Sequence, residues 1–217
     1  MINFVLTNDK LLNYGELENY LKSNSEVNTI DIGSWKFISN IGVDDALISK
    51  EEEDFILFGI GNPLLLDHFN EVLNATSLYE LWKEPKKILE LYKLLNGING
   101  FLLIQRSTQT IYLYTDLLGY WPLYYAEFNN TKYFTDSLKN LNFLIPDRLH
   151  WDNVAIQAYY ENGHFISGRC WYKGVRKGYA ASVYEASLTS EIKCYKFWGW
   201  DEIQMNSKDI IIVAILS

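Results

Sequence analysis

One stretch, residues 94–141, constrains the fold of this chain more than any other. It reads LLNGINGFLLIQRSTQTIYLYTDLLGYWPLYYAEFNNTKYFTDSLKNL. Short apolar runs rich in aromatic and aliphatic residues alternate with clusters of turn-forming residues, which is typical of strands joined by tight turns. Asn129-Asn130 suits a two-residue hairpin turn. The close spacing predicts an antiparallel meander of four strands, at 100–106, 110–116, 121–128 and 131–135.

The bend between the second and third of these strands is marked by Asp116, Gly119 and Pro122. Asp116 follows a strand and precedes Leu117-Leu118-Gly119. An aspartate in that position usually accepts hydrogen bonds from turn N–H groups. We therefore expect Asp116 to shape the turn, with a catalytic carboxylate as the alternative.

Helices are expected on both sides of this stretch. The strongest begins near Pro85, and its apolar residues Ile88, Leu91, Tyr92 and Leu95 fall on one face, with Asn96-Gly97 closing it. A weaker helical spacing covers 64–74. Further helices are expected at 15–22, 137–143 and 153–162, the last capped by Asp152 and ended by Gly163. Other strands are expected at 2–6, 27–32, 35–38, 55–60, 181–186 and 192–198.

Length and charge narrow the class of protein. The chain has 217 residues, of which 48% are hydrophobic, and a net charge of -8. This length suits one domain of ordinary size with a tail. The acidic balance argues against a general nucleic-acid binder, which needs clustered Lys and Arg. Aromatic residues make up 16% of the chain, which favours a β-rich core, with a ligand-stacking surface as the alternative.

The cysteines and histidines give no metal or nucleophile pattern. Cys170 and Cys194 form no CxxC pair, so we expect two reduced thiols, with a disulfide as the alternative. The first ten residues lack a signal-peptide pattern, and the longest apolar run, 210–216, is too short to span a bilayer. We expect a cytoplasmic protein without membrane contact. His68, His150 and His164 are scattered, and a small basic cluster (Arg169, Lys173, Arg176) is expected to be solvated or to contact an anion.

The order of short motifs resembles the N-terminal glutaminase domain of asparagine synthetase. This domain is a class II glutamine amidotransferase. Asn96, Gly97, Gly100 and Phe101 stand near the position of a family strand of LxGxF type. The run TDLLGYWPLYY, which contains Asp116, Gly119, Pro122 and Tyr124, resembles RDxxG followed by PLYY, and FTDSLKNL resembles FxSExKxL. Residues 168–175 and 195–200 resemble two later family segments. The resemblance covers 55–200, whereas the first fifty residues match in layout only.

The resemblance implies a fold and a domain plan. The fold is α+β, a four-layer α/β/β/α sandwich of two antiparallel sheets, as in N-terminal-nucleophile hydrolases. Residues 1–200 would form the glutaminase-like domain, with 152–200 as a helix-and-hairpin extension. Residues 201–217 would be a tail or the start of a missing synthetase domain.

The family's chemistry requires a Cys at the start of the chain, whose own α-amine acts as base. Here Ile2 stands at that position, and its side chain cannot attack an amide. Cys170 and Cys194 are remote in sequence, and Thr7 would need a cut after Leu6. No catalytic residue is therefore expected.

The chain also has few of the residues with which the family binds its substrate and its nucleotide. The family's glutamine loop is represented only by Gly61-Asn62, which we expect to be a turn, with Asn62 as the one side chain able to hold a glutamine-like ligand. The first Arg is Arg106, so none precedes the strand at 55–60 to hold a substrate carboxylate. The chain lacks an SGGxDS nucleotide loop. No cofactor is expected here, and ATP and Mg²⁺ would belong to a synthetase domain or subunit.

Three functions follow as hypotheses. The first is a catalytically degenerate glutaminase-like domain that serves as a structural partner for an ATP-dependent, amide-forming synthetase, as in relatives that make lactams or cyclise peptides. In that case no glutamine-like ligand is expected. The second is a non-catalytic binding module with an aromatic-rich surface for a peptide, sugar or protein. The third is an active hydrolase with an unrecognised nucleophile.

Overall fold

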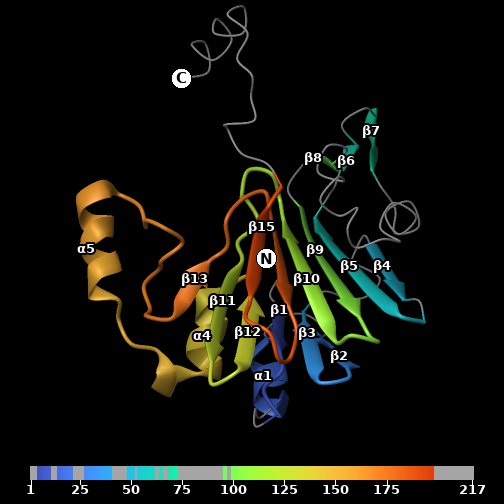
Figure 1. The fold of residues 1–217 in the computed structure, drawn as a ribbon, viewed down its shortest axis with the longest axis horizontal. Coiled ribbons are helices and arrows are strands. Elements are labelled where there is room, and N and C mark those ends of the chain that lie inside the picture. Colours follow the sequence, from blue (N-terminus) through green and yellow to red (C-terminus); the bar gives the residue numbers. More distant parts are fainter. Residues whose placement is uncertain are drawn as a thin grey trace, which may run out of the picture.

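Two six-stranded antiparallel sheets stacked on each other form the body of the protein (Figure 1). In this computed structural model, the residues described are 4–10, 14–21, 27–40, 48–51, 53–61, 64–65, 68–72, 95–96 and 99–197. The first sheet has the spatial order β13 (Val175–Lys177), β11 (Tyr124–Phe128), β12 (Thr131–Thr135), β1 (Phe4–Thr7), β3 (Trp35–Ser39) and β2 (Asn28–Ile32).

The second sheet has the order β15 (Lys193–Lys196), β14 (Ser182–Ala186), β10 (Thr110–Thr115), β9 (Asn99–Gln105), β5 (Phe55–Gly61) and β4 (Ile48–Glu51). A small third sheet contains β7 (His68–Val72), β6 (Leu64–Leu65) and β8 (Leu95–Asn96). The described helices are α1 (Tyr14–Leu21), α4 (Leu138–Leu144), the 3₁₀ helix η2 (Pro146–Arg148) and α5 (Asn153–Asn162).

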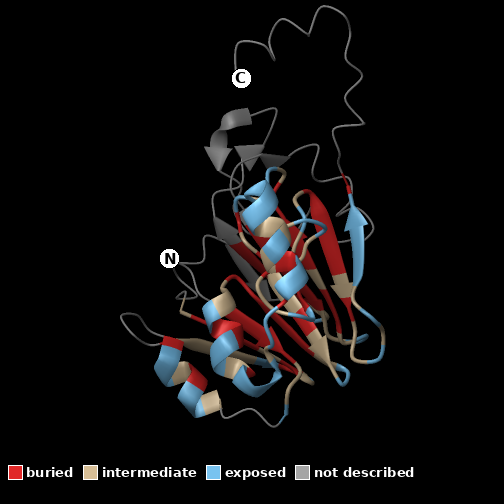
Figure 2. Cartoon of the chain, turned by 90° about the vertical axis from the view of Figure 1, so that its left-hand side faces the viewer, coloured by how far each residue is buried: buried red, intermediate tan, exposed pale blue. Residues whose placement is uncertain are grey.

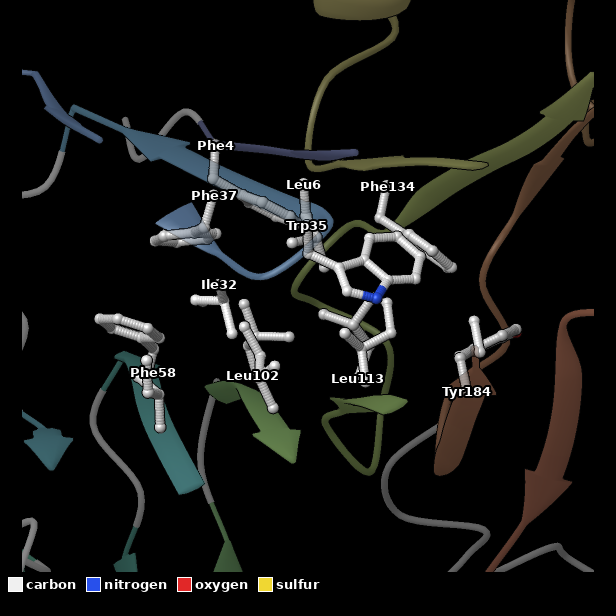
Figure 3. Close-up of a cluster of buried hydrophobic side chains, with 14 of the residues drawn as sticks. Phe4, Leu6, Ile32, Trp35, Phe37, Phe58, Leu102, Leu113, Phe134 and Tyr184 are labelled. Carbon is white, nitrogen blue, oxygen red and sulfur yellow. The ribbon is translucent and has the colours of Figure 1, made fainter. Parts of the chain in front are cut away.

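The main core lies between the two large sheets. Side chains of both sheets point toward one another there (Figure 3), and the inner faces of the strands are buried (Figure 2). Because side chains alternate along a strand, Phe4 and Leu6 of β1 enter this core and Val5 points to the opposite face. Burial of one such side chain contributes about 2 kcal/mol, so this layer is the main source of stability.

The outer face of the first sheet is covered by α1, α4 and the segment that follows α4. Leu17 and Leu21 of α1 pack with Val5 and Ile38. Leu141 of α4 packs with a second group on the same face, together with Ala126, Tyr133, Ile145, Cys170 and Val175. The α+β sandwich of two antiparallel sheets is thus as expected. The helix expected at 85–95 falls mostly on residues 73–94, which lie outside the described part, so the layer on the other side is not described.

The prediction of a four-strand meander is wrong. β9 and β10 form a hairpin in the second sheet, and β11 and β12 form a hairpin in the first. The connection at 116–123 crosses from one sheet to the other, so the third strand begins at Tyr124 and not at Trp121. Turn residues reveal where a hairpin turns, but they do not reveal which sheet the next hairpin joins.

Two further expectations are also wrong. Residues 64–74 were expected to be helical, but β6 and β7 pair there as antiparallel strands. Leu95 was expected to end a helix, but Leu95–Asn96 forms β8 and pairs with β6. A short apolar run is compatible with both the helical repeat and the two-residue repeat of a strand. Its spacing therefore does not distinguish a helix from a strand.

Turn and cap signals at single residues are confirmed. Asn129 and Asn130 both have positive φ, at 51° and 63°, as a two-residue hairpin turn requires. The Asp152 carboxylate accepts the N–H of Ala155 at 3.1 Å and starts α5, and Gly163 ends it with φ of 74°. Ser137 caps α4.

Two adjacent crossovers connect the sheets. The first, at 116–123, runs from β10 to β11, and the second, at 178–181, runs from β13 to β14. The Ala181 N–H donates to the Asp116 carbonyl at 2.9 Å, and the Gly178 N–H donates to the Leu123 carbonyl at 2.6 Å. The Thr115 hydroxyl donates to the Tyr179 carbonyl at 2.7 Å.

The Asp116 carboxylate holds the first crossover in shape. It is 1% exposed. It accepts the N–H groups of Leu118 and Tyr120 on Oδ1, at 2.9 and 3.0 Å, and that of Trp121 on Oδ2, at 2.6 Å. Gly119 adopts φ of 69°, and a Cβ there would lie 3.1 Å from the Cβ of Ala180. These contacts give Asp116 the turn-shaping role expected from the sequence.

We predict that Asp116→Ala lowers the free energy of unfolding by about 3 kcal/mol, because three N–H groups lose their acceptor and each costs about 1 kcal/mol or more. Asp116→Asn keeps one carbonyl oxygen and should lose less. Urea denaturation measures both, with the exposed Asp147→Ala as control. An Asp116→Ala variant as stable as that control would contradict this role.

Candidate functional site

The resemblance places the nucleophile at Ile2, which precedes β1 in the sequence and lies outside the described residues. β1 lies in the middle of the first sheet, between β12 and β3, with Val5 opposite both Thr135 and Ile38. Asp136 follows β12 directly and lies beside Phe4. The candidate site is therefore built from the first described residue of β1 and the connection from β12 to α4.

A buried polar cluster fixes this end of β1. The Phe4 N–H donates to Oδ1 of Asp136 at 3.2 Å, and the Phe4 carbonyl accepts from the Thr135 hydroxyl at 2.6 Å. The Asn140 amide donates to the Phe4 carbonyl at 3.3 Å and to the Thr135 hydroxyl at 2.9 Å. Thr135, Asp136 and Asn140 are all buried. The cluster satisfies the backbone of β1 where its ladder to β12 ends.

Asp136 is the titratable group of this cluster. Burial raises the pKa of its carboxyl to about 7, against the opposing effect of the Phe4 N–H that it accepts. A carboxyl with a pKa near neutrality is able to accept or donate a proton in catalysis. The Thr135 hydroxyl, however, donates to the Phe4 carbonyl and is bonded by Asn140, so it is engaged in the backbone contacts of β1.

The Trp121 ring, from the first crossover, packs against the core-facing side of β1. Its ring stacks on Phe4 with centroids 5.6 Å apart and planes at 13°. Gly100 leaves room for this ring, since a Cβ at that position would lie 2.4 Å from it. The Trp121 Nε1–H is buried and has no hydrogen-bond partner among the described residues. This donor could be satisfied by a polar group that those residues do not supply.

The sequence-predicted site residues are not brought together here. Asp116, Gly119 and Pro122 lie in the first crossover. Tyr124 belongs to β11 and packs on the outer side of the first sheet. Gly61 is the last residue of β5, opposite Asn99, whereas Asn62 and Ile2 lie outside the described residues.

Both cysteines are free thiols on different elements. Cys170 is buried in the outer cluster with Tyr133 and Leu141, and burial raises the pKa of its thiol, which disfavours the nucleophilic thiolate. Cys194 is exposed on β15. Neither belongs to the polar cluster at Phe4.

Arg169, from the basic cluster seen in the sequence, forms an ion pair with Asp152 at the start of α5. The Arg169 guanidinium binds the Asp152 carboxylate through Nε and Nη2, at 3.0 and 2.9 Å. Burial alone would raise the pKa of Asp152, but the Ala155 N–H and Arg169 hold it below its usual value. Arg169 therefore supports the start of α5. His150 and His164 are exposed.

Metal-binding clusters and membrane-spanning helices are both absent from the described part of the chain. No group of three or more His, Cys, Asp or Glu side chains is placed there to hold a metal ion. None of the helices in that part is both long enough and apolar enough to cross a membrane.

Sequence reasoning missed Asp136, Asn140 and Trp121 as members of a site. The only signal was the position of Asp136 between a strand and a helix in FTDSLKNL. A polar residue in such a connection is normally solvated. Its burial depends on β1, which is remote in sequence.

The two stacked antiparallel sheets define the class of the fold, which is that of the N-terminal-nucleophile hydrolases. The family profile described as "Glutamine amidotransferase domain" matches residues 74–198, more than half of the chain, and the chain belongs to this family. No curated protein matches the chain.

Two solved structures of enzymes match parts of the chain. One, described as the allosteric regulatory enzyme of purine biosynthesis, matches 91% of this chain and 49% of its own, with a TM-score of 0.53 and 12% identity. Glutamine phosphoribosylpyrophosphate amidotransferase from B. subtilis, complexed with ADP and GMP, matches 75% of this chain and 35% of its own, with a TM-score of 0.47 and 13% identity. The chain therefore spans half or less of the length of these solved chains.

We predict that Asp136→Asn changes how stability depends on pH. Burial raises the pKa of Asp136 to about 7 in the fold, above the ordinary value of 3.8 for an aspartate. The folded state therefore binds the proton more tightly, and stability falls as pH rises from about 4 to 7. Asp136→Asn removes this loss and keeps an acceptor for Phe4.

The free energy of unfolding of the variant, relative to the parent, should thus increase from pH 4 to pH 8. The increase should be a few kcal/mol, since each pKa unit corresponds to about 1.4 kcal/mol. Urea denaturation across this range measures it, with Asp147→Asn as the exposed control. Parallel curves for Asp136→Asn and the parent would show that Asp136 is not titrating in this window.

Proposed function

We propose that this chain is an asparagine-synthetase-like glutamine amidotransferase domain that has lost glutamine hydrolysis and acts as a structural partner of an amide-forming synthetase. The observation that carries the proposal lies at β1. Residues 1–6 contain no Cys, Ser or Thr, while the sheets around β1 keep the family's architecture. The place of the nucleophile is thus occupied by side chains that cannot attack an amide.

The remaining candidate nucleophiles fit this proposal. Thr7 is the first hydroxyl residue of the chain, but it is buried at the end of β1, and its Oγ1 accepts the N–H of Asp9 at 3.1 Å. The Cys170 thiol is buried against the Val175 carbonyl, 3.5 Å away. Neither residue contacts the cluster at Phe4. Asp136 would then serve to hold β1 in place, with no nucleophile to activate.

The partner follows from the same reasoning. A glutaminase-like domain without hydrolysis supplies no ammonia, so its contribution would be to position or stabilise the enzyme that forms the amide bond. We propose that this partner is a synthetase domain or subunit that binds ATP and Mg²⁺, and that the assembly is cytoplasmic.

A binding module with an aromatic surface is the second candidate. Several large rings are buried in the core; Trp35, Tyr133 and Tyr184 are each at most 1% exposed. One group of exposed rings nevertheless surrounds a cavity beside α4. This cavity is the observation that favours the second candidate.

We predict that the purified protein releases no glutamate or ammonia from glutamine above a protein-free blank. A coupled glutamate dehydrogenase assay over several hours measures this. Mass spectrometry of the mature N-terminus is the control, because an intact Met1 or Ile2 excludes the family's cysteine chemistry. Steady glutamate release that disappears in Thr7→Ala or Cys170→Ser would overturn the proposal and identify the nucleophile.

A further inference from the structure

A cavity of about 820 Å³ lies between α1, α4, η2 and the segments around Trp151 and Tyr172. This volume is within the range of small-molecule sites, about 300–1,000 Å³. The cavity is formed on the outer side of the first sheet. None of the residues of the cluster at Phe4 lines it, so its chemistry is separate from that of the glutaminase site.

Two stacked aromatic pairs line the cavity. Tyr20 of α1 stacks on Phe143 of α4, with centroids 4.3 Å apart and planes at 12°. Trp151 stacks on Tyr172, with centroids 5.1 Å apart and planes at 26°. Each pair fixes its rings in orientation without burying them, since Trp151 is 59% exposed and Tyr20 and Phe143 are each 37% exposed. Exposed, oriented rings around a hollow are typical of a surface that takes a flat partner.

The polar side chains that line the cavity determine its charge. Among the described residues that line it, Lys139 and Asn142 on α4 are polar, and none is Asp or Glu. Among the described residues, no carboxylate pairs with the Lys139 ammonium. In a chain with a net charge of -8, a cavity whose described lining carries a cation and no carboxylate favours an anionic ligand. The Asn142 amide adds both a donor and an acceptor.

We propose that this cavity binds a small organic anion with a flat ring. The ring would contact the two aromatic pairs, and a carboxylate or phosphate would pair with Lys139. The inference deepens the second candidate function and rests on it, but it does not depend on whether the start of β1 hydrolyses glutamine. A neutral sugar would leave Lys139 unused.

Two matched pairs of probes test the proposal by titration calorimetry. Indole-3-acetate is compared with neutral indole-3-acetamide, and AMP is compared with neutral adenosine. We expect at least one anion to bind about two to five times more tightly than its neutral partner, the range of a solvent-exposed ion pair. The acetate and phosphate arms distinguish a carboxylate ligand from a nucleotide-like ligand.

Variants assign the binding to this cavity. Lys139→Gln should remove the preference for the anion, whereas Lys177→Gln on β13, an exposed lysine outside the cavity, should leave it intact. Trp151→Ala should weaken all bound probes about tenfold, whereas Tyr160→Ala, which removes an exposed ring outside the cavity, should not. Trp151 is largely exposed, so this variant should fold, and its thermal midpoint checks this.

The proposal is overturned if neither anion binds, if neutral and anionic probes bind equally, or if Trp151→Ala and Tyr160→Ala behave alike. Glutamine hydrolysis in the same samples would contradict the scaffold role and leave the cavity assignment in place. Absence of probe binding would contradict the cavity assignment and leave the scaffold role in place. The two proposals therefore fail separately.

Discussion

The structure depends on the hydrogen bonds that join two crossovers between the sheets. Asp116 organises the first crossover with its carboxylate and accepts the Ala181 N–H of the second with its carbonyl. Each sheet therefore receives one hairpin from the 99–135 stretch. The inner face of each hairpin points toward the opposite sheet. Without these bonds, buried N–H groups at the rim would lack acceptors, and the large aromatic core would not be closed on this side.

The contacts around β1 form the second part of this framework. The polar cluster at Phe4 holds the start of β1, which lies in the middle of the first sheet between β12 and β3. Phe4 is held from both sides, by Asp136 and Asn140 at its backbone and by Trp121 at its ring. The described part of the framework thus holds β1 firmly in place. Under our proposal, the domain has kept the parts that stabilise it and lost the part that reacts.

Local chemistry was predictable from the sequence, and long-range pairing was not. Asp152, Gly163 and the Asn129-Asn130 turn act through their own backbone, so their roles follow from residue type and position. The separation of β9–β10 from β11–β12 depends on contacts with 178–181, which no short-range pattern reveals. The burial of Asp136 likewise depends on β1, more than a hundred residues away.

The central claim is that the family's framework persists without its nucleophile. The most direct test is to incubate the protein with a glutamine analogue that carries an electrophilic diazoketone, and to measure its intact mass. This reagent alkylates a thiol or hydroxyl that is activated next to a glutamine pocket. We predict an unchanged mass under conditions that fully label an active glutaminase. A single stoichiometric adduct, mapped to one residue, would contradict the account.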